Sequence, residues 1–101
     1  MASVKVCKID AVSSGDFKQF NIQETEVLVI NSNGRFFCLA ARCTHAGAPL
    51  AEGELVGDTL KCPWHGSIFK ITDGAVLKGP AVKPLKAYSY VLKDDYITIE
   101  I

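Results

Sequence analysis

The chain has 101 residues, of which 49% are hydrophobic, and its 11 basic and 11 acidic side chains give a formal net charge of zero. This length suits one domain over residues 1–101 and leaves no room for a second cofactor domain. The balanced charge lacks the basic excess of nucleic-acid-binding proteins. No run approaches the roughly 18 apolar residues of a membrane span, and the first residues lack the apolar core of a signal peptide. We therefore expect a monomeric cytoplasmic protein without nucleic-acid or membrane partners.

Alternation of apolar and polar residues predicts an all-β chain of about ten short strands, with no segment of helical period. Asn33-Gly34 and residues 93–95 supply hairpin turns, because Asn, Asp and Gly adopt positive φ at low cost. This pattern favours an antiparallel sandwich or small barrel. The expected strands are residues 4–9, 17–22, 27–30, 35–39, 53–56, 59–61, 67–71, 75–77, 88–92 and 97–101.

Three stretches interrupt this pattern and are predicted to be loops: residues 43–49, 62–67 and 78–84. The first two each follow a predicted strand and contain Gly and Pro, which suit tight bends. The third is too rich in proline for a central strand, and we expect it to cover a neighbouring part of the molecule.

Two of the four cysteines, Cys7 and Cys38, stand inside apolar strand-like runs with no histidine nearby. Such cysteines are most often small buried hydrophobic residues. We therefore expect them to serve packing rather than chemistry.

The other two cysteines each lie within three positions of one of the chain's two histidines. The pattern is Cys43-x-His45, sixteen intervening residues, then Cys62-x-x-His65. Two loops that each offer one thiolate and one imidazole predict a metal centre with two sulfur and two nitrogen ligands. A structural zinc site is the alternative, although its loops usually space ligands as C-x₂₋₄-C. A nucleophilic Cys–His pair has less support, because nothing indicates an orienting carboxylate or an oxyanion hole.

The sequences Cys43-Thr44-His45 and Cys62-Pro63-Trp64-His65-Gly66 resemble the cluster loops of the Rieske iron–sulfur proteins, which read C-x-H and C-P-x-H-G. The resemblance implies the Rieske-type antiparallel β fold, with both loops at one tip. It also implies one [2Fe–2S] cluster, with Cys43 and Cys62 on the inner iron and His45 and His65 on the outer iron. Two neutral imidazoles in place of two thiolates make electron addition less opposed, and Rieske centres span roughly −150 to +300 mV.

The resemblance also indicates where in this range the potential falls. The respiratory branch of the family has a disulfide between its loops, and the matching positions here are Ala48 and Trp64. The same branch has a serine and a tyrosine that donate hydrogen bonds to cluster sulfurs; Ser67 matches the serine, but Phe69 replaces the tyrosine. We therefore expect a potential in the lower part of the range, with Ser67 favouring a higher value.

Four further residues around the ligands have both a structural and a functional interpretation. Gly47 and Gly66 suit tight turns and also allow backbone N–H groups to approach sulfur. Trp64 either packs beside the cluster or contributes to an apolar docking rim. Pro80 either ends a strand or, by the resemblance, belongs to a loop that shields the cluster.

The acidic residues Glu52, Glu54 and Asp58 either steer a basic partner or form a solvated loop.

The resulting expectation is a one-electron carrier rather than an enzyme. The resemblance implies a flavin-dependent NAD(P)H reductase as donor and a Rieske non-haem iron oxygenase as acceptor. With both histidines assigned, no 2-His-1-carboxylate site remains for an oxygenase of its own. A small subunit of a nitrite reductase, another redox complex and a structural zinc module are the alternatives.

Overall fold

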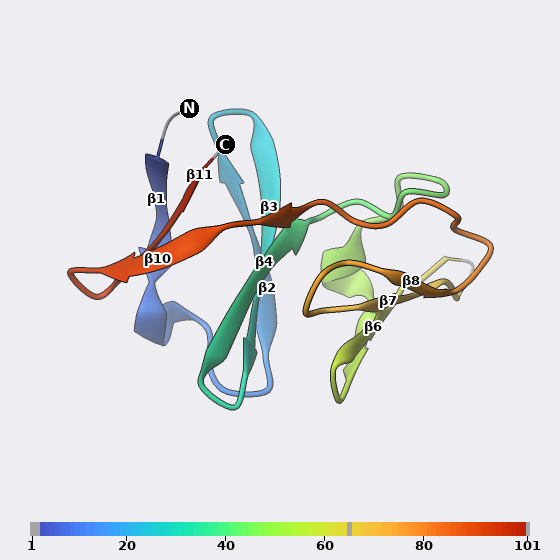
Figure 1. Cartoon of the computed structure of the whole chain (residues 1–101), viewed down its shortest axis with the longest axis horizontal. Coiled ribbons are helices and arrows are strands. Elements are labelled where there is room, and N and C mark those ends of the chain that lie inside the picture. The colour runs from blue at the N-terminus through green and yellow to red at the C-terminus, as the bar shows by residue number, and fades with distance from the viewer. Residues whose placement is uncertain (1–2, 65, 101) are drawn as a thin grey trace.

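The computed structural model describes residues 3–64 and 66–100 (Figure 1). Within these residues it contains short strands and two single turns of 3₁₀-helix, so the prediction of an all-β fold is confirmed. The elements are β1 (Ser3–Lys8), η1 (Ile9–Ala11), β2 (Phe17–Ile22), β3 (Thr25–Ser32), β4 (Arg35–Ala40), η2 (Leu50–Glu52), β5 (Glu54–Val56), β6 (Thr59–Lys61), β7 (Ile68–Lys70), β8 (Val76–Lys78), β9 (Ala87–Tyr88), β10 (Tyr90–Lys93) and β11 (Tyr96–Glu100).

The strands form three antiparallel sheets with the orders β1-β11-β10, β2-β3-β4-β9 and β5-β6-β7-β8. The β2-β3-β4-β9 sheet lies between the other two (Figure 1). Two-residue turns join β3 to β4 at Asn33-Gly34 and β10 to β11 at Asp94-Asp95, all four residues having positive φ. The predicted hairpins are therefore present, and their turns have the backbone conformation expected of these residues.

Strand β3 contributes to two separate cores because successive side chains on a strand point to opposite faces. Val27 and Val29 pack into the core shared with β1 and β11, whereas Leu28 and Ile30 pack into the core shared with β6 and β7. All four side chains are fully buried. The second of these cores also contains Cys43 and Cys62, so the central sheet directly supports both candidate loops.

Several expected boundaries were wrong. The single strand expected over residues 88–92 is two strands, because the chain changes sheets at Ser89: Tyr88 pairs with Cys38, and Tyr90 pairs with Ile99. Residues 9–11 and 50–52 form 3₁₀ turns that the alternation did not reveal. The strands expected to start at residues 53 and 67 start one residue later, and residue 101 lies outside the described residues.

No helix among residues 3–64 and 66–100 is long and apolar enough to cross a lipid bilayer.

Candidate metal centre

The first candidate loop follows β4 and is closed by its own backbone. The Leu50 N–H donates to the Ala41 carbonyl, and the Cys43 N–H donates to the Ala48 carbonyl, each at 2.9 Å. Within this closure the Gly47 N–H donates to the Cys43 carbonyl at 2.9 Å, and Gly47 has a φ of +70°. Cys43 is 3% exposed and packs in the core between the central sheet and the β5–β8 sheet. The loop therefore presents a buried thiol from a backbone that is held at both ends.

The second candidate loop follows β6 and is closed in a similar way. The Cys62 N–H donates to the Ser67 carbonyl at 2.8 Å, and both side chains are buried. Gly66 has a φ of +76°, which a residue with a side chain rarely adopts. His65 lies outside the described residues, so its role as a ligand stays a prediction.

The two loops bring the Cys43 and Cys62 thiols into hydrogen-bonding contact with each other. Burial raises the pKa of the Cys43 thiol, the backbone N–H groups of His45 and Ala46 lower that pKa, and the adjacent Cys62 raises it. Two neighbouring buried thiolates would repel each other, so a bound cation is needed to stabilise both in the ionised form. This is the environment that a metal with thiolate ligands requires.

The described donors lie at different depths. His45 is exposed, whereas Cys43 and Cys62 are almost completely buried. A structural zinc ion needs all its ligands within about 2.0 to 2.3 Å, whereas a Rieske cluster separates its thiolates and imidazoles onto two irons. The buried sulfur pair and the exposed imidazole fit the cluster better than one zinc ion.

The proline-rich segment between β8 and β9 contacts both candidate loops. The Thr44 hydroxyl donates to the Lys83 carbonyl at 2.6 Å, and the Ala81 N–H donates to the Ser67 hydroxyl oxygen at 3.0 Å. Ala81 is buried in the same core as the two cysteines. The segment therefore lies against both loops, as a covering role requires, while Pro80 itself is exposed.

Four positions bear on the expected potential of the cluster: 48, 64, 67 and 69. Ala48 is fully buried, Trp64 is 57% exposed, and none of the four cysteines forms a disulfide. Phe69 is fully buried and has no hydroxyl to donate. Ser67 is also fully buried, and because a hydroxyl accepts and donates at once, its contact with the Ala81 N–H leaves its own proton for donation.

We expect Ser67→Ala to lower the midpoint potential. Hydrogen bonds to cluster sulfurs stabilise the more negative reduced state, and a bond to a charged group contributes about 1.5 to 3 kcal/mol, or about 60 to 130 mV for one electron. A redox titration followed by EPR measures this shift. Thr59→Ala is the control, because that hydroxyl donates to the Val56 carbonyl at the far end of β6. Equal midpoints in the Ser67 variant and the wild type would contradict the donor role.

Three exposed apolar residues belong to the second candidate loop and to the proline-rich segment bonded to it: Trp64 at 57% exposure, Val82 at 87%, and Pro80. We call this group the apolar rim. The exposure of Trp64 favours the docking interpretation over plain packing, because an indole that packs beside a buried group loses most of its contact with water.

The acidic residues do not act as one surface. Glu52 and Glu54 line a hollow beside Cys62 and Pro63 together with Lys61, which places opposite charges side by side. Asp58 lies instead in the turn between β5 and β6, next to the β3–β4 turn. This arrangement favours the interpretation of these residues as a solvated surface.

Sequence reasoning missed the contacts that Thr44, Ala81 and Arg42 make around the loops. The bonds of Thr44 to Lys83 and of Ala81 to Ser67 join the proline-rich segment to the two loops, and Arg42 donates to the Gly47 carbonyl at 3.3 Å. A contact between residues 44 and 83 leaves no local pattern in the sequence. The only available signal was that Arg42 directly precedes a candidate ligand.

Comparison with known proteins identifies the class of protein that this fold and these loops define. Residues 2–89 match the family model described as "Rieske [2Fe-2S] domain". The chain belongs to this family, and its cofactor is a Rieske-type [2Fe–2S] cluster.

Relatives of similar length are ferredoxin components. The chain is 31% identical to the 3-phenylpropionate/cinnamic acid dioxygenase ferredoxin subunit of Photorhabdus laumondii, over 100% of this chain and 96% of that protein. It is also 31% identical to apoptosis-inducing factor 3 of Mus musculus over 93% of this chain, but it spans only 16% of that relative's length.

Solved structures give the same result. The Sphingomonas yanoikuyae B1 ferredoxin superposes with a TM-score of 0.93 at 28% identity, covering 99% of both chains. A chain in the complex of reduced oxygenase and oxidized ferredoxin of carbazole 1,9a-dioxygenase superposes with a TM-score of 0.88 at 28% identity, covering 96% of this chain and 91% of that one.

Proposed function

We propose that this protein carries single electrons from a flavin-dependent NAD(P)H reductase to a Rieske non-haem iron oxygenase. In this proposal residues 1–101 act as a single domain and a monomer in the cytoplasm. Cys43 and Cys62 bind the inner iron, and His45 and His65 bind the outer iron. The ferredoxin relatives of similar length and the ferredoxin–oxygenase complex support this role.

The observation that carries the proposal is the difference in depth between the sulfur donors and His45. Cys43 and Cys62 are at most 3% exposed, whereas His45 is exposed. The bound cluster supplies the exchange of one electron. The chain's residues bury the sulfur side, hold the two loops together and leave an imidazole at the surface, where a partner's redox centre can approach most closely.

The apolar rim suits a weak and transient contact. Its residues are few, and the surrounding surface mixes acidic and basic side chains. Small electron-transfer interfaces bury little area and dissociate quickly, as is needed by a carrier that cycles repeatedly between its partners.

Docking through the apolar rim is tested by Val82→Glu. Val82 is 87% exposed, so the substitution leaves the fold intact and places an unpaired charge at the contact. We expect the rate of electron transfer to the oxygenase component of a carbazole or biphenyl dioxygenase system to fall about tenfold or more. Stopped-flow absorbance of the reduced protein measures this rate, and the midpoint potential should stay unchanged.

The matched control is Val91→Glu, because Val91 is 60% exposed on β10, in the sheet on the other side of the molecule from the candidate loops (Figure 1). Its transfer rate should equal that of the wild type. Equal rates in all three proteins would contradict docking at the apolar rim. Failure to accept electrons from the reductase or to pass them to the oxygenase would contradict the proposed partners and favour another redox complex.

A further inference from the structure

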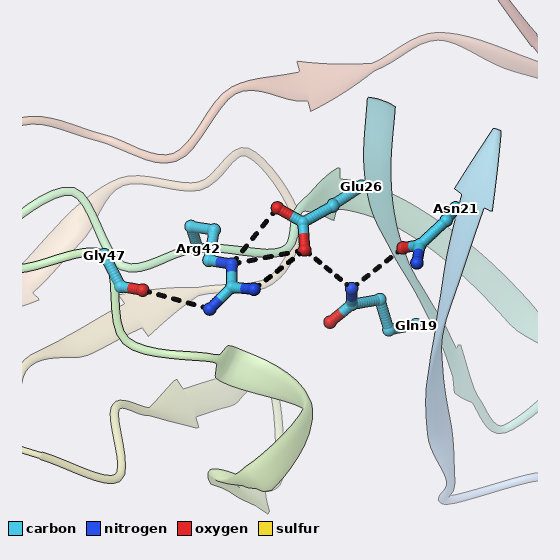
Figure 2. Close-up of polar contacts among 5 residues, drawn as sticks. All are labelled: Gln19, Asn21, Glu26, Arg42 and Gly47. Carbon is cyan, nitrogen blue, oxygen red and sulfur yellow. Dashed lines mark hydrogen bonds and ion pairs between the residues drawn. The ribbon is translucent and has the colours of Figure 1, made fainter. Parts of the chain in front are cut away.

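An ion pair connects the central sheet to the first candidate loop. Glu26 on β3 receives three hydrogen bonds from Arg42: Nε donates to both carboxylate oxygens at 3.1 and 3.2 Å, and Nη2 donates to Oε2 at 2.9 Å (Figure 2). The hydrogen bond from Arg42 lowers the pKa of Glu26, so the carboxylate stays charged at neutral pH. This forked geometry fixes the plane of the guanidinium as well as its position.

The carboxylate is itself held from the neighbouring strand. The Gln19 amide on β2 donates to Glu26 Oε2 at 3.0 Å and to Asn21 Oδ1 at 2.9 Å. Glu26 is also paired with Asn21 in the β2–β3 register. Glu26 is thus part of the rigid sheet and not a freely moving surface side chain.

The remaining arm of the guanidinium reaches into the loop. Arg42 Nη1 donates to the Gly47 carbonyl at 3.3 Å (Figure 2). The N–H of Gly47 donates to the Cys43 carbonyl, so both polar groups of this glycine are engaged. Arg42 therefore holds the loop at Gly47, where the chain bends with a φ of +70°.

The position of this bend decides which backbone groups face sulfur. The N–H groups of His45 and Ala46, which lie between Cys43 and Gly47, donate to the Cys43 side chain. Hydrogen bonds to a ligand sulfur lower the electron density on the metal and raise its potential. A loop that moves away from Cys43 would weaken these bonds and lower the potential.

The pair also places charge next to the ligand. Arg42 directly precedes Cys43, and Glu26 neutralises its charge at contact distance. Since the Arg42 and Glu26 side chains are 49% and 35% exposed, the pair contributes little to global stability. Its influence on the potential of a nearby group does not depend on that contribution to stability, because it is set by the charge and orientation of the two side chains.

We propose that Glu26 and Arg42 are positioning residues that set the reduction potential, by fixing the backbone of the first candidate loop (residues 43–49) around the Cys43 sulfur and by balancing the charge beside it. This inference rests on the proposed role of Cys43 as a ligand. Neither residue contacts the cluster in this scheme. Arg42 acts through the Gly47 carbonyl, and Glu26 acts through Arg42.

The test is an EPR-monitored redox titration of the cluster-loaded protein with four changes: Glu26→Gln, Arg42→Gln, Arg42→Lys and the double change to Gln at both sites. Removing the carboxylate leaves Arg42 unbalanced and should raise the equilibrium constant for reduction. Removing the guanidinium should lower that constant. From Coulomb's law for partly screened charges we expect changes of about two- to fivefold, which correspond to about 20 to 40 mV for one electron.

The double variant separates charge from position, because it removes one charge of each sign. If the midpoint potential of the double variant is lower than that of the wild type, and the difference persists in high salt, the difference measures the loss of the loop contact. Salt screens only the charge effect. Arg42→Lys keeps the charge but lacks the fork that reaches both Glu26 and Gly47. It should shift the EPR g-values as Arg42→Gln does, while its midpoint moves less.

The matched control is Arg35→Gln, at the opposite end of β4, where the guanidinium lies over the Phe37 ring. It should change the midpoint far less than Arg42→Gln. Wild-type midpoints and g-values in all four variants, with a full iron content, would overturn the inference. Failure of the ligand assignment is distinguishable, because a Cys43→Ala protein would then keep its cluster.

Discussion

Replacing Cys43 or Cys62 with alanine should leave the purified chain without its [2Fe–2S] cluster. Each residue is buried at the contact between the two loops, and the structure brings these two thiols together. Removal of one leaves the inner iron with a single thiolate, and no other described cysteine lies in the same core. Visible absorption, iron and labile sulfide should all be lost, together with the rhombic EPR signal of the reduced protein.

The control is Cys7→Ala, which tests whether the loss is specific. Cys7 and Cys38 are buried in the core on the other side of the central sheet. Burial, with a smaller contribution from the nearby Cys7, raises the pKa of the Cys38 thiol to about 12, so this thiol is protonated and inert at neutral pH. Cys7→Ala should bind the cluster with wild-type stoichiometry. A cluster retained in Cys43→Ala, or lost in Cys7→Ala, would contradict the proposed ligand set.

The second large effect is expected for Gly74→Ala. A Cβ at this position would lie 2.2 Å from the Leu85 carbonyl oxygen, and the backbone has a φ of +80°. The Leu85 N–H donates to the Gly74 carbonyl at 2.8 Å, so the substitution would separate the end of the proline-rich segment from the β7–β8 turn. Backbone strain and overpacking together should lower the free energy of unfolding by about 2 to 5 kcal/mol.

Gly57→Ala is the matched control, since Gly57 has a φ of +59° but no atom within 4 Å of the added Cβ. Its free energy of unfolding should fall by only about 1 kcal/mol, the strain of a side chain in the left-handed conformation. Thermal unfolding followed by circular dichroism compares the two, because 1 kcal/mol shifts the midpoint of a domain of this size by about 4 to 8 °C. Equal midpoints for the two variants would show that the Leu85 contact relaxes without cost.

Much of the fold could be predicted because its signals are local. The alternation in residues 97–101 and the Asn33-Gly34 turn are properties of neighbouring residues. Strand β11 (Tyr96–Glu100) and this turn are both present. The break at Ser89 could not be predicted. Residues 88 and 90 are both tyrosines in one alternating run, yet they pair with different sheets, and that choice depends on strands 50 residues earlier and nine residues later.

The sequence by itself determined the candidate ligands and the class of cofactor. The spacing Cys43-x-His45 and Cys62-x-x-His65 is a short-range pattern, and the chemistry of the four side chains follows from their types. It also determined the absence of a cysteine at positions 48 and 64 and of a hydroxyl at position 69, which bear on the potential.

Only the tertiary structure decided how these side chains are buried, covered and held. Three contacts join distant segments: that of the two thiols, the Thr44–Lys83 bond across 39 residues, and that of Arg42 and Glu26 with loop 43–49. Such contacts leave no periodic trace, because they arise only when burial of the two cores fixes how the three sheets pack. Residue types therefore specify the chemistry at the tip, and long-range packing specifies its geometry.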